Sequence, residues 1–318
     1  MKRSVIFPDY GNQYVGMGKE LYDTQRVMQE YFEEAADCLG INFVKLCFAS
    51  SEVELSSLPQ GPLSLFLVEA ASGGMLREHG VTYELVTGLD MVSWYAAVHA
   101  AHGVSFPDGL YIIRKWSELY TTAMTHEPMQ GMDVVVTKYE TIAMVTAWCE
   151  QLMARGDGYI AVTRVMPDRL FVVGTVALCA QLQVLLTRES LSFQLRELFD
   201  HFDVLMPTES AQQAKQYLEK VDFATPLCPV LDPLQGVLLT TADELRATAS
   251  ALLERPVRGD AIVAHLKLYA GSIVAIPSLN IRDRLQRMLP EQSVTTLESE
   301  AASWHSQAEN IYHDSEAE

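Results

Sequence analysis

The sequence predicts an α/β fold with a smaller domain inserted into it. Short apolar strands alternate with amphipathic helices before residue 126 and again after residue 202, which is typical of a parallel sheet covered by helices. Between these parts, about 70 residues follow the order strand, helix, strand, strand, helix, which indicates a ferredoxin-like domain. We therefore expect a large domain of residues 1–126 and 202–318 and a small domain of residues 127–201.

The composition is that of a globular protein with an acidic surface. The chain has 318 residues, 49% of them hydrophobic, and a formal net charge of −18. This charge argues against a nucleic-acid partner, because phosphate binding needs clustered Lys and Arg. No apolar run approaches the ~20 residues of a membrane-spanning helix, and the N-terminus lacks the apolar region of a signal peptide. The five cysteines stand far apart, so we expect free thiols, no membrane association and a cytoplasmic location.

In the first part of the chain, the pattern predicts a strand at residues 4–7 and then a glycine-containing loop. Helices are predicted at residues 24–39 and 62–79, the second closed by Gly80. A buried strand that ends at Gly88 follows, and then helices at 94–102 and 108–124.

In the middle of the chain, the pattern predicts strands at residues 132–137, 158–163 and 170–174. Helices are predicted at 141–155, 177–187 and 191–201. The large domain then resumes with a strand end at about residues 203–207 that leads into a helix. Further strands are predicted at 227–231 and 271–276, and further helices at 241–253, 261–268 and 281–289.

The turn after Gly88 is the first candidate for a functional site. An apolar run that ends in glycine, followed by Asp90 and an Ala-rich helix, has the layout of a nucleophile elbow, in which a sharp turn lifts one side chain into a cleft. The lifted side chain would be Asp90. The same residues also fit an ordinary strand followed by a helix with Asp90 as its N-cap. Both interpretations remain open at this point.

His99 and His102 lie three residues apart in a predicted helix, a spacing that two metal ligands can have. No third His, Cys or carboxylate stands at a suitable spacing. We therefore expect histidines on the helix surface and no metal site.

Several short motifs occur in the order and spacing of a known family, along the chain to about residue 290. They are residues 7–18 (FPDYGNQYVGMG), the helix and strand of residues 62–88, residues 105–110 (SFPDGL) and residues 254–258 (ERPVR). Together they resemble the malonyl-CoA:acyl-carrier-protein transacylase family, which includes the acyltransferase domains of polyketide synthases. The resemblance implies an α/β-hydrolase-like large domain, a ferredoxin-like insertion, a binding cleft between the two, and no cofactor.

The resemblance also places the family's reactive residues on this sequence, where the residue types differ. Counting from upstream puts Asp90 at the family's serine, and counting back from downstream puts Met91 there. The family's histidine falls at Glu209, in residues 204–209 (VLMPTE). The family mechanism needs a serine activated by a histidine, so malonyl transfer is not expected.

The expected substrate-binding positions differ as well. Trp116 stands where the family has the arginine that pairs with the malonyl carboxylate. Tyr10 replaces the glutamine of the opening loop, and Val165 replaces an asparagine. A malonyl carboxylate would therefore lack its charge partner.

Two functions remain open on this basis. In the first, the protein acts in polyketide or fatty-acid biosynthesis and binds an acyl carrier protein, a polyketide synthase module or acyl-CoA, without malonyl transfer. In the second, Asp90 and Glu209 face each other across the cleft as an acid and a base. They would then catalyse hydrolysis, dehydration or double-bond migration on an acyl thioester.

In that second function, Tyr10 would donate a hydrogen bond to the thioester carbonyl, and Trp116 would favour an apolar acyl chain. A third alternative is residual transfer through Ser93. Because Ser93 lies about one helical turn beyond the elbow, its hydroxyl is expected to point elsewhere.

Overall fold

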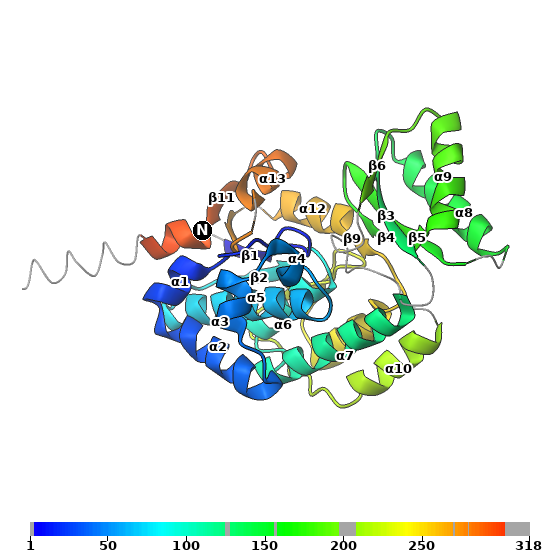
Figure 1. Ribbon diagram of the computed structural model, residues 1–318. Helices are drawn as coiled ribbons and strands as arrows, with labels where there is room; N and C mark the ends of the chain where they lie inside the picture. Colours follow the sequence, from blue (N-terminus) through cyan, green and yellow to red (C-terminus); the bar gives the residue numbers. More distant parts are fainter. Residues whose placement is uncertain are drawn as a thin grey trace, which may run out of the picture.

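The computed structural model of the chain describes residues 3–124, 128–155, 158–196, 208–269, 271–278 and 280–302. Two sheets organise these residues, and each has its own helices (Figure 1). The larger part and the smaller part meet where the N-terminal segment, α12 (Gly259–Leu268) and α13 (Ile281–Met288) approach the smaller sheet. This arrangement confirms the predicted α/β fold with an inserted ferredoxin-like domain.

The larger sheet has six strands in the order β11-β10-β1-β2-β7-β8. They are β1 (Arg3–Phe7), β2 (Leu85–Gly88), β7 (Val230–Leu231), β8 (Leu238–Leu239), β10 (Ser272–Ala275) and β11 (Ser293–Thr296). All neighbours are parallel except β7 and β8. Parallel strands are covered by helices on both faces, which is why β1 and β2 read as continuous apolar runs. The loops after β1 and β2 therefore open at the same edge of the sheet.

The larger sheet is covered by helices from both ends of the chain (Figure 1). Besides α12 and α13, they are α1 (Lys19–Thr24), α2 (Arg26–Leu39), α3 (Phe43–Ala49), α4 (Glu52–Leu55), α5 (Gln60–Glu78), α6 (Met91–Ala100), α7 (Phe106–Met124), α10 (Thr208–Leu218) and α11 (Ala242–Ala251). Helices α5 and α6 are buried along nearly their whole length, because α2 and α7 pack outside α5. No helix within the described ranges is both long and apolar enough to cross a bilayer.

The smaller sheet is built from one continuous stretch of the chain plus one strand from the larger part. Its elements are β3 (Met129–Val135), α8 (Glu140–Met153), β4 (Ile160–Val165), β5 (Arg169–Thr175), α9 (Val176–Arg188), β6 (Phe193–Arg196) and β9 (Val257–Arg258). The strand order is β6-β3-β5-β4-β9. Helices α8 and α9 share one apolar core with one face of this sheet, so the other face is free to turn toward the larger part.

The prediction of a helix at residues 191–201 was wrong. Residues 193–196 form β6, which pairs antiparallel with β3, while residues 197–207 lie outside the described residues. The strand end predicted at 203–207 also lies outside them. Local pattern favoured a helix, but the edge of β3 offers backbone donors and acceptors that a strand satisfies. This strand completes the ferredoxin-like order.

His99 is a core residue and not the surface histidine that we expected. Its Nδ1 lies 3.0 Å from the Val104 carbonyl oxygen, and its Nε2 lies 2.8 Å from the hydroxyl of Tyr31. Burial lowers the pKa of His99 to about 4, so the ring is neutral at physiological pH. No group of three or more His, Cys, Asp or Glu side chains among the described residues is arranged to hold a metal ion.

Candidate binding cleft between the two sheets

In the turn after β2, Asp90 is the N-cap of α6, which is the interpretation that we set beside the nucleophile elbow. Asp90 has extended backbone angles (φ −149°, ψ −171°), so it lacks the left-handed backbone conformation that would mark a strained turn. Its Oδ1 accepts hydrogen bonds from the backbone N–H of Ser93 (2.8 Å) and from the hydroxyl of Ser93 (2.6 Å). Its Oδ2 accepts one from the backbone N–H of Tyr10. Asp90 thus caps α6 and ties down the loop after β1.

Asp90 is fully buried, and so is Ser93. Burial raises the pKa of Asp90, while the Arg164 guanidinium and the hydrogen bonds from Ser93 and Tyr10 oppose that rise. All these partners hold the carboxyl group inside the protein. Ser93, the residue of the third alternative, is also buried away from solvent.

Glu209 is exposed in the first turn of α10. Within the described part of the chain, no hydrogen bond or ion pair joins Glu209 to Asp90. Asp90 is buried whereas Glu209 is exposed, so no contact among the described residues supports an acid and base pair.

The four residues that we expected to bind substrate do not lie together in one site. Met91 begins α6 and is buried, Trp116 is buried and packs edge to face with the Tyr95 ring, and Val165 belongs to the core under α8 and α9. Only Tyr10 lines the cleft described below. Its hydroxyl donates to the Ser56 carbonyl oxygen at 2.8 Å, so the group expected to face a thioester is bonded to the backbone of the chain itself.

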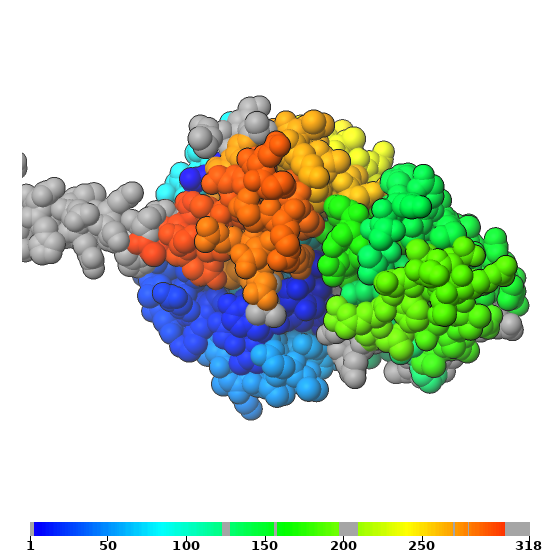
Figure 2. Space-filling model, turned by 90° about the horizontal axis from the view of Figure 1, so that it is seen from above, coloured from blue at the N-terminus to red at the C-terminus, as the bar shows by residue number. Residues whose placement is uncertain are grey.

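A cleft of about 460 Å³ lies between the two parts of the molecule. On one side it is lined by the loop after β1 and by α12 and α13, and on the other by β3, β4, β5 and β6. Figure 2 shows the orange segment with α13 and the green surface of the smaller part facing each other above the dark blue N-terminal residues. The described residues that line the cleft include no serine, threonine, cysteine or histidine.

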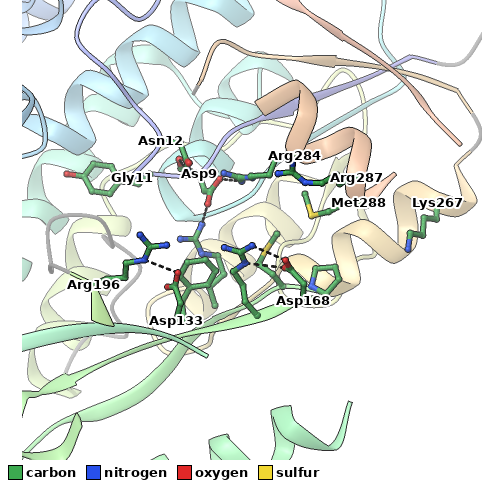
Figure 3. Close-up of a pocket in the computed structure, with 16 residues that line it drawn as sticks. Asp9, Gly11, Asn12, Asp133, Asp168, Arg196, Lys267, Arg284, Arg287 and Met288 are labelled. Atoms are coloured by element: carbon green, nitrogen blue, oxygen red, sulfur yellow. Dashed lines mark hydrogen bonds and ion pairs between the residues drawn. The ribbon is translucent and has the colours of Figure 1, made fainter. Parts of the chain in front are cut away.

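The cleft is rich in positive charge although the chain has a net charge of −18. Its described lining has six cationic side chains and three carboxylates (Figure 3). The cations are Arg164, Arg169, Arg196, Lys267, Arg284 and Arg287. A concave surface with this excess attracts anionic ligands and partners.

Each of the three carboxylates is already paired with an arginine of the cleft. Asp168 binds Arg169 in a two-pronged contact of 2.9 and 3.3 Å. Arg196 Nε donates to Asp133 Oδ2 at 3.0 Å. The third carboxylate, Asp9, is bound by two arginines at once: one oxygen accepts from Arg164 and the other from Arg284.

Lys267 and Arg287 differ from the other cations of the cleft. Both are exposed, they come from α12 and α13, and neither has a carboxylate partner within the described ranges. Four arginines of the cleft therefore share three carboxylates of the chain itself, while the outer edge adds two cations that lack such a partner among the described residues.

Comparison with known proteins identifies the fold. No protein-family model matches the chain. The malonyl CoA-acyl carrier protein transacylase of Bacillus subtilis (strain 168) is 24% identical over 262 residues, which cover 81% of this chain and 80% of that protein. The solved acyl-carrier-protein S-malonyltransferase of Bartonella henselae has a TM-score of 0.83 at 16% identity, covering 93% of this chain and 95% of that one.

A second solved structure contains a partner. It is a malonyl-transacylase in complex with a type II polyketide synthase acyl-carrier protein, with a TM-score of 0.81 and 18% identity over 93% of this chain and 96% of that one. This protein has the fold of the malonyl CoA-acyl carrier protein transacylases.

Sequence reasoning missed the charged residues that line the cleft of this transacylase fold. A β-bulge explains why Arg164 was missed. Strict alternation from Ile160 and Val162 would place Arg164 in the core under α8 and α9, but the register shifts between Val162 and Arg164. Arg164 therefore pairs with Phe171 on the cleft face, and Val165 takes the core position. An arginine within an apolar strand was the one signal that could have revealed it.

Glu69 is a second acidic group in the core of the transacylase fold, within α5. Its side chain is fully buried, and neither carboxyl oxygen has a hydrogen-bond partner among the described residues. Burial raises the pKa of Glu69 well above its usual value, and the charges of Asp90 and Asp9 raise it further. Burial therefore favours the protonated, uncharged form of Glu69 in the folded chain.

Replacement of Glu69 is expected to stabilise the protein. Glu69→Met should raise the free energy of unfolding at pH 7 by about 1–3 kcal/mol, the usual cost of a buried polar group without a partner. The folded wild type holds a proton that the unfolded chain releases above pH ~4.5, so wild-type stability should fall as the pH rises from 5 to 8. Glu69→Gln should show less of this fall. Urea unfolding at both pH values measures the two effects.

The matched control for this test is Glu33→Met, on the exposed side of α2, which should change stability by less than about 0.5 kcal/mol. Loss of stability in Glu69→Met, or an unchanged pH dependence in Glu69→Gln, would contradict the expectation.

Proposed function

We propose that this protein binds an acyl carrier protein, or the acyl thioester that it carries, in the cationic cleft, and that it does not transfer the acyl group through a serine and a histidine. The observation that supports this most is the lining of the cleft, which combines an excess of positive charge with no serine, threonine, cysteine or histidine among its described residues. The first property favours an anionic partner. The second leaves the described lining without the nucleophile and base of acyl transfer.

The choice of partner rests on charge and on the likeness to known proteins. Acyl carrier proteins are acidic, and this chain is acidic too, so contact between the two needs a local positive surface. The outer edge of the cleft, with Lys267 and Arg287, provides one. The structural neighbour that was solved with an acyl-carrier protein supports the same class of partner.

The alternative of an Asp90 and Glu209 pair has less support. Asp90 is fully buried and uses both carboxyl oxygens in capping α6 and in holding the loop after β1. An acid or base must reach the proton that it transfers. Neither Asp90 nor Glu209 lines the cleft, so we favour binding over chemistry by this pair.

The binding test uses a double charge reversal at the outer edge. Lys267→Glu with Arg287→Glu should weaken the binding of holo-acyl carrier protein by roughly tenfold or more, because two favourable charges become unfavourable. Wild-type binding should also weaken with added salt. Isothermal titration calorimetry at two ionic strengths measures both effects.

The control is Lys45→Glu with Arg188→Glu, which changes the net charge equally at two exposed positions, on α3 and α9, that do not line the cleft. It should leave the affinity within about twofold. Intact-mass spectrometry of the protein after incubation with malonyl-loaded carrier should show no added acyl group. A stable acyl adduct, or equal weakening by both double variants, would overturn the proposal.

A further inference from the structure

The two arginines that hold Asp9 form a carboxylate clamp at the floor of the cleft. Arg164 comes from β4 of the smaller sheet and Arg284 from α13 of the larger part, so the clamp joins the two sides of the cleft. Figure 3 shows Asp9 beside Arg284. The side chain of Arg164 is 1% exposed, that of Arg284 22% and that of Asp9 6%. Each carboxyl oxygen of Asp9 accepts from a different guanidinium, which is an arrangement that binds carboxylates strongly.

Neighbouring groups keep Asp9 bound between the two arginines. The Arg164 guanidinium also lies over the Phe171 ring, 4.2 Å from its centre, so the ring helps to hold it in place beside Asp9. Burial alone would raise the pKa of Asp9, but the charges of Arg284 and Arg164 outweigh it and lower the pKa to about 2. Asp9 is therefore ionised throughout the physiological range, and the clamp stays occupied by the chain's own carboxylate.

We propose that Asp9 determines ligand specificity by filling a carboxylate site that Arg164 and Arg284 would otherwise offer to the ligand. A ligand that carries its own carboxylate, such as a malonyl group, would have to displace Asp9 and leave that buried charge without partners. The cleft therefore admits acyl groups that end without a negative charge and rejects acyl groups that end in a carboxylate. The choice between acyl groups rests on the proposed function, whereas the existence of the clamp does not.

The clamp is tested with small ions and without a carrier protein. Malonate is the probe, and uncharged malonamide and sodium chloride at equal ionic strength are the controls. Wild type should show no saturable binding of malonate by calorimetry. Asp9→Ala and Asp9→Asn should bind malonate at least tenfold more tightly than malonamide and show a rise in melting temperature with malonate. Asp9→Glu should behave as wild type, because it restores a carboxylate.

A second measurement relates the clamp to the acyl group. Wild type should bind butyryl-loaded carrier at least tenfold more tightly than malonyl-loaded carrier, and Asp9→Asn should reduce this preference. The proposal would be overturned if wild type bound malonyl-loaded carrier more tightly than butyryl-loaded carrier. It would also be overturned if the Asp9→Asn variant folded but did not bind malonate. If no carrier binds to any form of the protein, the proposed function is wrong. If malonate then binds only to the Asp9→Ala and Asp9→Asn variants, the inference about the clamp is still supported. Asp9→Asn keeps the volume of the side chain, so the test does not depend on Asp9→Ala folding.

Discussion

Gly88→Ala is expected to lower the free energy of unfolding by about 4 kcal/mol or more, which is a large part of the stability of an ordinary domain. A Cβ atom at this position would lie 2.1 Å from the backbone nitrogen of Trp94 and 2.2 Å from the carbonyl carbon of Ser93. Backbone atoms in a buried helix cannot turn aside as the end of a side chain can. Helix α6 would have to move away from β2, and the Asp90 cap would move with it. Urea unfolding, or the soluble yield where no folded protein is recovered, measures the loss.

Gly80→Ala is the matched control for this substitution. Gly80 also ends an element, with φ at +64°, but a Cβ there meets nothing within 4 Å. Only the left-handed backbone conformation is disfavoured, so the expected loss is about 1–2 kcal/mol. Equal losses for Gly88→Ala and Gly80→Ala would show that backbone conformation, and not the close contact of α6 with β2, sets the requirement for glycine at 88.

Asp9→Ala is expected to lower the free energy of unfolding by about 3–5 kcal/mol at pH 7, because Arg164 and Arg284 would lose the buried carboxylate that pairs with both. The pH dependence follows from the lowered pKa of Asp9. Its folded pKa is about 2 and its ordinary value is 3.8, so the stabilisation is present above pH ~4 and is lost as the pH falls toward 2. Asp9→Asn should lack this loss. Urea unfolding between pH 2 and 7 measures both quantities.

The control for Asp9 is Asp23→Ala, which removes an exposed i, i+4 pair with Lys19 on α1. An exposed pair of this kind contributes less than about 1 kcal/mol. A loss in Asp9→Ala as small as that of Asp23→Ala would mean that the clamp does not hold the two parts of the molecule together.

The alternation of strands and helices was visible in the sequence because each element of the larger part buries a continuous or periodic apolar face. The expected helix at residues 62–79 is α5 (Gln60–Glu78), and the expected strand at residues 4–7 is β1 (Arg3–Phe7). Strand β6 (Phe193–Arg196) was not visible, because four residues carry little periodicity and their partner β3 lies about 60 residues earlier in the chain. A strand this short forms because it can pair with the edge of a strand that is already present, here β3.

The candidate site was only partly predictable. Tyr10, which the loop motif singled out, is among the residues that line the cleft, but Asp9 beside it was not singled out. Asp90 was correctly placed at the strand-to-helix turn, yet its carboxylate caps α6 in place of facing a ligand. The direction of a side chain at a turn depends on backbone angles and on partners far away in the sequence, and local pattern contains neither.

By itself, the sequence determined the α/β class, the acidic net charge and the order of the longer elements, because these follow from composition and from the spacing of apolar residues. Only the tertiary structure decided where the positive charges collect. Arg164 reaches the cleft through a bulge in β4, and it meets Asp9 and Arg284 across separations of 155 and 120 residues. Three charges so far apart in the chain share one buried site because desolvation forces each to find an opposite partner, and only folding brings those partners within reach.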